Sequence, residues 1–362
     1  MTIRQPPDAG RHIRTGRGFR QWRSVAGFVG ISTMCCLAAS DPLFQLERVA
    51  EGVYAAIARS PLDSNAAIVL LDDSVLVVDT HARPSTARAL IGQIRDLTSK
   101  PVRFVVDTHF HWDHYQGNSA YPAAWPEGVE IIASSPTFAA IRSRGIPRAQ
   151  HERTIIPRRL DEIRKELGRT ADPNRKAELQ DRYRMWEDYA KELHSMSLAL
   201  PTMTFQRSLV LHRASRTVQI LWLGRGHTDG DVVVHLPREK VLVSGDLLHA
   251  YMPYMADSSP YDWIETLEKL RRLDFEFVIP GHGSVLKGKT QLDLWKSYLT
   301  DLMQETARIY AEGASLEQAV GGVTAALSPR YADRFPAGMY SFSNFIRGNV
   351  EKAYRVVSGN QE

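Results

Sequence analysis

The chain of 362 residues contains very little cysteine: Cys35 and Cys36 are neighbours near its start, and none follows them. Beyond residue 36 the protein therefore has neither a disulfide framework nor a thiolate ligand for a metal ion. Internal repeats and low-complexity tracts are also missing. With 43% hydrophobic and 24% charged residues, as is ordinary for a folded globular protein, the composition excludes a disordered chain, a collagen and a coiled coil.

The first forty residues differ in composition from the rest. Six arginines and one acid lie between positions 4 and 23, an apolar stretch follows over positions 25–37, and Ala38-Ala39-Ser40 ends the segment. A basic region, a short apolar region and a small-residue end are typical of a secretory signal peptide. Residues 1–40 are therefore predicted to be the signal peptide of a protein that is exported, either periplasmic or secreted. An uncleaved anchor, a wrongly assigned start and lipidation at the two cysteines remain alternatives.

Removal of that segment changes the charge of the protein. Residues 41–362 hold 39 lysines and arginines against 40 acids, so their net charge is about −1, whereas the pI of the full chain is about 9.0. The basic pI of the full chain arises from the arginines of the predicted signal peptide, so it does not indicate a nucleic-acid-binding surface. We therefore expect a small-molecule substrate, no nucleic-acid partner and no stable membrane insertion after signal removal. The oligomeric state is left open.

Periodicity predicts a mixed α/β chain. Apolar runs separated by turn residues over residues 44–79 predict antiparallel strands joined by hairpins. Further strands are predicted at residues 102–106, 129–133, 203–211, 217–223, 232–236, 241–244 and 277–279, and helices at residues 84–97, 136–144, 261–273, 290–312 and 345–357.

Residues 147–200 form a distinct segment. They are rich in charge and carry apolar residues at helical spacing on both sides of Asp172-Pro173-Asn174. This pattern predicts a helical insertion made of two amphipathic helices. A solvated hairpin laid on the core is the favoured interpretation, and an active-site lid and a dimer contact are the alternatives.

The segment Thr108-His109-Phe110-His111-Trp112-Asp113-His114 carries the strongest functional signal. Three imidazoles and a carboxylate within six residues do not suit a hydrophobic core, because each costs free energy to bury unless a partner satisfies it. The segment follows a predicted strand, so it forms a loop in which alternate histidines can face one ion and the next two side chains another. Imidazole and carboxylate are ligands suited to zinc.

Three later segments add ligands of the same kind. His227 lies in the glycine-rich loop 224–231, Asp246 follows the strand predicted at residues 241–244, and His282 lies in Pro280-Gly281-His282-Gly283. A single histidine or aspartate in a glycine-rich turn is more often structural, so each segment alone is weak. Together with the histidine cluster, these strand ends predict a metal site.

The order HxHxDH, GHT, GD and PGHG over residues 44–285 resembles the metallo-β-lactamase superfamily. The resemblance implies an α/β fold, an αββα four-layer sandwich, in a domain over residues 41–362 with C-terminal helices over residues 289–362. It also implies two metal ions, two Zn²⁺ with iron or manganese as alternatives. The ligands implied for the first ion are His109, His111 and His227. Those implied for the second are Asp113, His114 and His282, with Asp246 as the bridge between both ions.

The same resemblance implies a hydrolase in which a metal-bridging hydroxide attacks an ester, thioester, lactone or amide-type carbonyl. Asp113 is implied to orient this hydroxide and to accept its proton. β-Lactamase activity of the subclass B3 type is an alternative, although the lactamases lack an aspartate at the position of Asp246. A phosphodiesterase is another alternative. A non-catalytic metal-binding protein is disfavoured, because structural zinc sites are closed shells of four ligands.

Other residues near these motifs are candidates for supporting roles. The candidates for fixing imidazole tautomers are Thr108, Asp79 and Thr228. Contacts with the substrate are predicted for His81, His249, Tyr251 and Trp112. Candidates to line an apolar pocket mouth, with the core as the alternative, are Phe110, Tyr115 and Tyr254.

Overall fold

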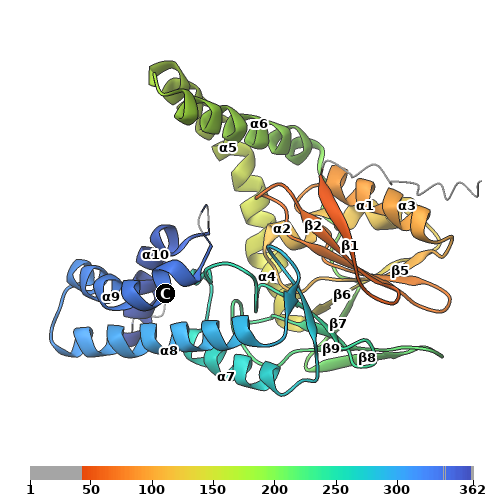
Figure 1. Ribbon diagram of the computed structural model, residues 1–362. Helices are drawn as coiled ribbons and strands as arrows, with labels where there is room; N and C mark the ends of the chain where they lie inside the picture. The colour runs from red at the N-terminus through yellow and green to blue at the C-terminus, as the bar shows by residue number, and fades with distance from the viewer. Residues whose placement is uncertain (1–42, 337, 339, 360–362) are drawn as a thin grey trace, which may run out of the picture. The chain divides into compact units, whose positions relative to one another are not determined.

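The computed structural model describes residues 43–336, 338 and 340–359 (Figure 1). These residues fall within one compact unit, Ser40–Glu362. The predicted signal peptide lies outside the described residues. Among the residues that are described, no helix combines the length and the apolarity that crossing a membrane requires.

The first half of the chain builds a seven-stranded sheet whose strands lie in chain order. They are β1 (Phe44–Ala50), β2 (Val53–Ala58), β3 (Ala66–Leu70), β4 (Val75–Val78), β5 (Val102–Val106), β6 (Glu130–Ser134) and β7 (Met203–Phe205). The first four strands pair antiparallel, as predicted, and β4 to β7 run parallel. β4 is wholly apolar and buried, which is typical of a strand covered on both faces.

The second half builds a six-stranded sheet in the order β13-β12-β11-β10-β9-β8. Its strands are β8 (Ser208–His212), β9 (Thr217–Leu221), β10 (Val233–Leu236), β11 (Val241–Gly245), β12 (Phe277–Pro280) and β13 (Leu286–Lys287). Only the β11–β12 pair is parallel. The single strand predicted at residues 203–211 is wrong, because the chain passes from one sheet to the other at residues 206–207 and divides it into β7 and β8.

Helices cover the outer faces of both sheets. Outside the insertion, the α-helices of the described residues are α1 (Pro84–Leu97), α2 (Trp112–Tyr115), α3 (Ala120–Ala124), α4 (Ser135–Ala140), α7 (Pro260–Arg271), α8 (Thr290–Ala311), α9 (Leu316–Tyr331) and α10 (Phe342–Val357), and the short α2 belongs to the segment that carries predicted ligands. α9 was not predicted, since the neighbouring glycines 321 and 322 weaken its helical signal. A capping box between Ser315 and Gln318 starts it, and Val323 and Leu327 pack into the core.

Three cores hold the layers together. Between the sheets, Val69 of the first sheet belongs to the same hydrophobic cluster as Ile220 and Val234 of the second. On the outer face of the first sheet, Leu90 of α1 packs with buried strand residues. On the outer face of the second, Trp295 of α8 does the same. The order of layers is therefore αββα, which confirms the predicted fold class.

The insertion consists of α5 (Ile146–Arg169) and α6 (Pro173–Ser195), two helices that lie side by side (Figure 1). α6 begins at the predicted break, where the Asp172 carboxylate accepts a hydrogen bond from the Asn174 backbone N–H at 2.9 Å. Near the base of the pair, Tyr189 and Leu193 share a small core with Leu62, which lies between β2 and β3. The base of the insertion is thus packed against the domain.

Candidate metal centre

The predicted ligands lie in four segments at the ends of strands from both sheets. The segment after β5 supplies His109 and His111 from a loop and Asp113 and His114 from the short helix α2, so the loop predicted for all four is only partly right. The loop before β10 supplies His227, and the ends of β11 and β12 supply Asp246 and His282. These segments are distant in sequence, and the face-to-face packing of the two sheets brings them to one place.

The seven side chains form two groups of possible metal ligands. The first group is His109, His111, His227 and Asp246, and the second group is Asp113, His114 and His282, with ligand atoms in each group within 4.8 Å of one another. Asp246 also faces the second group: its Oδ1 is 3.5 Å from His114 Nε2 and its Oδ2 is 3.4 Å from His282 Nε2. The geometry therefore matches the predicted division into two sets with Asp246 between them.

Two glycines allow the strand ends to approach this closely. A Cβ at Gly281 would overlap the Asp246 carboxylate. Gly245 has a φ of 51°, a left-handed conformation that side chains disfavour, and a Cβ there would collide with Thr108. Glycine is therefore required directly before Asp246 and directly before His282, because no side chain fits at either position.

Several inward-facing atoms lack a partner, and this tests whether cations fit the site. In the described part of the chain, His109 Nε2, His114 Nε2 and Asp246 Oδ1 are buried without a hydrogen-bond partner. Leaving buried polar atoms unpaired costs about 1–3 kcal/mol each. Cations between these atoms would satisfy all three, so the residues fit a metal centre.

The opposite ring nitrogens of the first group are held by hydrogen bonds. His109 Nδ1 lies 3.1 Å from the Thr108 hydroxyl, which donates to Asp79 at 2.8 Å. His227 Nδ1 lies 3.0 Å from the carbonyl oxygen of Tyr254. An acceptor on one ring nitrogen places the proton there and leaves the other nitrogen free to bind a metal.

Asp79 holds the second group in the same manner. Its carboxylate accepts a hydrogen bond from His114 Nδ1 at 2.7 Å as well as those from the hydroxyl and backbone N–H of Thr108. Asp79 has a φ of 58°, a left-handed conformation that is unfavourable for a non-glycine residue. The predicted supporting contacts of Asp79 and Thr108 are thus present. Thr228 instead donates to Asp231 at 2.6 Å and stabilises its own loop.

Asp257 is a residue of the site that sequence analysis missed. Its carboxylate lies 2.8 Å from His111 Nε2, 146 positions away in sequence, and also forms an ion pair with Arg144. No motif marks Asp257, which lies in the loop before α7. Because Nε2 of His111 is bound to this carboxylate, Nδ1 is the nitrogen that faces His227 Nε2, at 2.8 Å.

Burial and charge put most of the ligands in the form that binds metal. Burial lowers the pKa of His109 well below its usual value and that of His227 to about 3, so both rings are neutral. Burial opposes ionisation of Asp113, but His114 and His282 outweigh it and lower its pKa to about 2. Asp246 is likewise held ionised, against burial, by His282 and His114.

The raised pKa values of His114 and His282 show that this site attracts positive charge. Burial opposes their protonation, but Asp79, Asp113 and Asp246 raise the pKa of His114 to about 10. Asp246 and Asp113 raise the pKa of His282 well above its usual value. The carboxylates therefore attract positive charge, which protons provide here and which divalent cations can provide in their place.

Aromatic rings from the C-terminal part form a wall along the centre. Tyr340 stacks on His282 with ring centroids 5.6 Å apart and on Tyr251 at 5.5 Å. Phe345 of α10 contacts Tyr340 at 5.5 Å and Tyr254 at 5.9 Å, and Tyr254 lies 6.2 Å from both His111 and His227. The aromatic wall, Tyr251–Tyr340–Phe345–Tyr254, thus runs from the second group to the first.

The wall borders the accessible side of the centre. Asp113 is the most exposed ligand, with 15% of its side chain accessible, whereas His114 is fully buried. A cavity of about 200 Å³ lies against His282 and is lined by Tyr251, Tyr340 and Arg59. A small molecule can therefore reach the second group beside aromatic rings.

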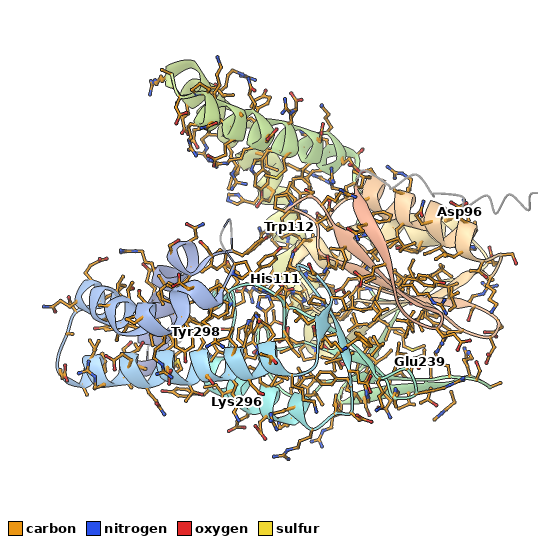
Figure 2. All side chains as sticks on the ribbon, viewed as in Figure 1. Asp96, His111, Trp112, Glu239, Lys296 and Tyr298 are labelled. Carbon is orange, nitrogen blue, oxygen red and sulfur yellow. The ribbon has the colours of Figure 1, made fainter. Side chains whose placement is uncertain are left out.

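The other predicted substrate contacts lie in different places. Trp112 is half-buried at the base of the insertion, where its ring lies 4.9 Å from that of Tyr189 (Figure 2). His249 is buried beside the second group, with its ring 5.8 Å from that of His282. His81 is fully buried, stacks on Phe44 and has Nδ1 2.6 Å from the Ser64 carbonyl oxygen. Nothing among the contacts of His81 supports a role in binding substrate.

The three residues predicted to line the pocket mouth differ in exposure. Tyr115 is fully buried in a small core. Phe110 is 8% exposed, and the Arg144 guanidinium covers its ring at 4.4 Å. Tyr254, at 43% exposed, is the one of the three that faces solvent beside the centre.

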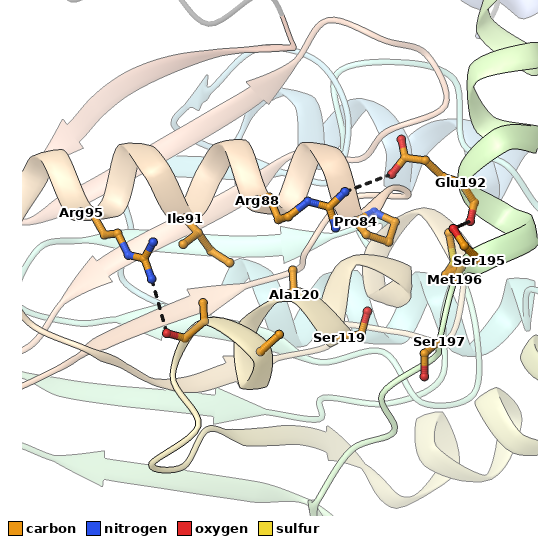
Figure 3. Close-up of a pocket in the computed structure, with 12 residues that line it drawn as sticks. Pro84, Arg88, Ile91, Arg95, Ser119, Ala120, Glu192, Ser195, Met196 and Ser197 are labelled. Carbon is orange, nitrogen blue, oxygen red and sulfur yellow. Dashed lines mark hydrogen bonds and ion pairs between the residues drawn. The ribbon is translucent and has the colours of Figure 1, made fainter.

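A separate cavity of about 670 Å³ lies between α1, α3 and the end of α6 (Figure 3). Arg88 of α1 forms an ion pair across it with Glu192 of α6 at 3.9 Å. Glu192 also accepts a hydrogen bond from the Ser85 backbone N–H at the start of α1. None of the seven predicted ligands lines this cavity, and its ion pair fastens the insertion to α1.

Sequence comparison finds a family profile and curated relatives that match this chain. A sequence profile described as the metallo-beta-lactamase superfamily matches residues 59–282. The linear primary-alkylsulfatase of Pseudomonas sp. (strain ATCC 19151) is 22% identical over 302 residues, which cover 78% of this chain and 53% of that protein. The metallo-beta-lactamase type 2 of Bacteroides fragilis is 32% identical over 111 residues, 29% of this chain and 43% of that protein. The chain spans about half the length of these curated relatives.

Solved structures show the same fold. The metallo-beta-lactamase from Pontibacter korlensis has a TM-score of 0.52 and 18% sequence identity, and the match covers 71% of this chain and 99% of that one. The family profile ends at residue 282, so it does not reach Tyr340 and Phe345 of the aromatic wall.

Proposed function

The chain belongs to the metallo-β-lactamase superfamily of hydrolases, and we propose that it is a dinuclear zinc enzyme that cleaves an ester-type bond: a carboxylic ester, a thioester or a lactone. The observation that carries this proposal is the convergence of seven possible ligands, among them three buried atoms that have no hydrogen-bond partner. Two zinc ions held there would lower the pKa of a shared water to about 7 and polarise the bond to be cleaved.

The side chains at the centre have distinct roles in the proposed reaction. The Asp246 carboxylate lies 3.5 Å from His114 Nε2 of the second group and 3.6 Å from His227 Nε2 of the first, so it would help to hold both ions. Asp113 is ionised and the most accessible ligand, so it is placed to orient the attacking water and pass on its proton. Tyr251 and Tyr340 offer an apolar surface beside His282 for the leaving part of the substrate.

Hydrolysis of alkyl sulfate esters is a second candidate, which one comparison favours. The match to the alkylsulfatase extends over 78% of this chain, whereas the match to the Bacteroides β-lactamase covers 29%. The aromatic wall would suit an alkyl chain, since aromatic rings and alkyl groups pack without polar partners. We place β-lactam hydrolysis below both, because Asp246 stands at a position where the lactamases lack an aspartate. We also propose that the enzyme is exported and acts on a small molecule.

The test is a panel of hydrolysis assays on the purified, zinc-loaded protein. The substrates are p-nitrophenyl esters, an acyl thioester, a lactone, dodecyl sulfate and a chromogenic cephalosporin, each with a chelator-treated sample beside it. We expect chelator-sensitive turnover of at least one ester-type substrate and little turnover of the cephalosporin. Turnover of the cephalosporin alone would overturn the ester assignment. Turnover that survives complete metal removal would overturn the zinc mechanism.

A further inference from the structure

A second recess lies beside the metal centre and has no part in the function proposed so far. It is a cleft of about 580 Å³ between the loop before α7 and the end of α10. Asp257 lines the cleft and lies 2.8 Å from His111 Nε2. The cleft therefore begins on the side of the His111 ring that points away from the predicted metal.

The cleft has more positive than negative side chains. Its cations are Arg144, Arg225, Lys352 and Arg355, and its carboxylates are Asp229, Asp257 and Asp262. Arg144 pairs with Asp257, and Arg225 pairs with Asp262 at 2.5 Å and with Asp229 at 3.9 Å. All three carboxylates are thus paired with Arg144 or Arg225.

Lys352 and Arg355 are left without a carboxylate. Within the described ranges, neither has one within the 4.0 Å that defines an ion pair. Lys352 is half-buried, and burial followed by the neighbouring Arg355 lowers its pKa. Two cations that repel each other in a partly desolvated cleft gain most from an anion placed between them.

α10 carries residues of both the cleft and the aromatic wall of the metal centre. Phe345 and Lys352 are seven residues apart, so both lie on one face of the helix. Phe345 contacts Tyr254, whose ring lies 6.2 Å from that of His111. One face of α10 thus presents Phe345 to the aromatic wall of the centre and Lys352 to the cleft.

We propose that this cleft is a specificity subsite that binds an anionic group, a carboxylate or a sulfate, carried by the substrate at a distance from the bond that is cleaved. The inference rests on the proposed function, because it assigns one end of the substrate to the metal centre. It narrows the substrate class to molecules with a hydrolysable bond, an apolar middle part and a negatively charged end.

The experiment measures binding and not turnover. Zinc-loaded protein is titrated calorimetrically with α,ω-dicarboxylates from succinate to suberate and with their monomethyl esters, so that the second carboxylate is the variable. The test variant is K352Q/R355Q. The matched control is R169Q/K176Q, which removes the same amount of charge, one arginine and one lysine, from exposed positions of the insertion.

We expect one chain length at which the wild type and the control bind the dicarboxylate about tenfold more tightly than its monomethyl ester. In K352Q/R355Q that advantage disappears, while the affinity for the monomethyl ester changes less than about twofold. An advantage that persists in K352Q/R355Q, or that the control variant also loses, would overturn the subsite.

Inorganic sulfate distinguishes the two possible sources of the anion. If sulfate binds the wild type and not K352Q/R355Q, and no dicarboxylate of any length has an advantage, the cleft holds a free anion and the claim about the substrate is refuted. A dicarboxylate advantage in a protein that hydrolyses no ester-type substrate would support the subsite and refute the proposed function, so the two failures are distinguishable.

Discussion

Replacement of Asp257 is expected to weaken metal binding in the first group, although this residue binds no metal itself. Its carboxylate accepts the hydrogen bond from His111 Nε2 at 2.8 Å and so directs Nδ1 toward the centre. Loss of such a partner typically lowers metal affinity or activity about 10- to 100-fold, or about 1.4–2.8 kcal/mol. Because 23% of the Asp257 side chain is accessible, water can replace part of the lost interaction.

The substitutions Asp257→Asn and Asp257→Ala should weaken metal binding by different amounts. Asp257→Asn keeps a neutral acceptor for His111, and hydrogen bonds to a charged acceptor are about twice as strong as neutral ones. The asparagine variant should therefore lose about tenfold in affinity and the alanine variant nearer to 100-fold. Asp262→Asn is the matched control, because this neighbouring carboxylate pairs with Arg225 and not with a histidine.

Competition between the protein and a chromophoric chelator measures the stepwise zinc affinities. One of the two steps should weaken in the Asp257 variants, while the other step and both steps of the Asp262 control should stay within about twofold of the wild type. If Asp257→Ala binds both ions as tightly as the wild type, the inferred role of Asp257 in orienting His111 is wrong.

Four further expectations concern Asp246, the protons on His114 and His282, the pH dependence of stability, and the aromatic wall. Asp246→Ala should retain at most one zinc ion by elemental analysis and lose more activity than the roughly 100-fold typical of a supporting residue; full activity would exclude the bridge. Because the pKa values of His114 and His282 are raised, to about 10 for His114, zinc binding at pH 7 should release about two protons, measurable by calorimetry in buffers of different ionisation enthalpy. The raised pKa of His114 also stabilises the metal-free protein fully below pH 6.5, and this stabilisation should be lost as the pH rises through about 10, which thermal unfolding across that range would show. Tyr340→Ala should raise KM about tenfold for long-chain esters and little for acetyl esters, whereas Tyr310→Ala, on α8, should change neither.

The candidate metal ligands were found from sequence because each lies in a short motif at a strand end. His109, His111, Asp113 and His114 share one segment of six residues, and glycine lies next to each of the others. Gly281 shows the physical reason, since a Cβ there would overlap the Asp246 carboxylate. A steric constraint of this kind requires a glycine next to the candidate ligand, so it can be recognised in the sequence.

The supporting residues were not predictable in the same way. Asp257 meets His111 across 146 positions, and Tyr340 reaches His282 from a segment beyond the family profile. Such contacts depend on how whole layers pack, and nothing adjacent in sequence marks them. The division of residues 203–211 between two sheets has the same origin, because periodicity describes a strand but not the sheet that it joins.

Anomalous X-ray diffraction at the zinc edge, from crystals of the zinc-loaded protein, tests the dinuclear centre most directly. We predict two peaks, one among His109, His111 and His227 and the other among Asp113, His114 and His282, with the Asp246 carboxylate between them. A single fully occupied peak, or peaks elsewhere in the protein, would contradict the dinuclear centre and the mechanism built on it.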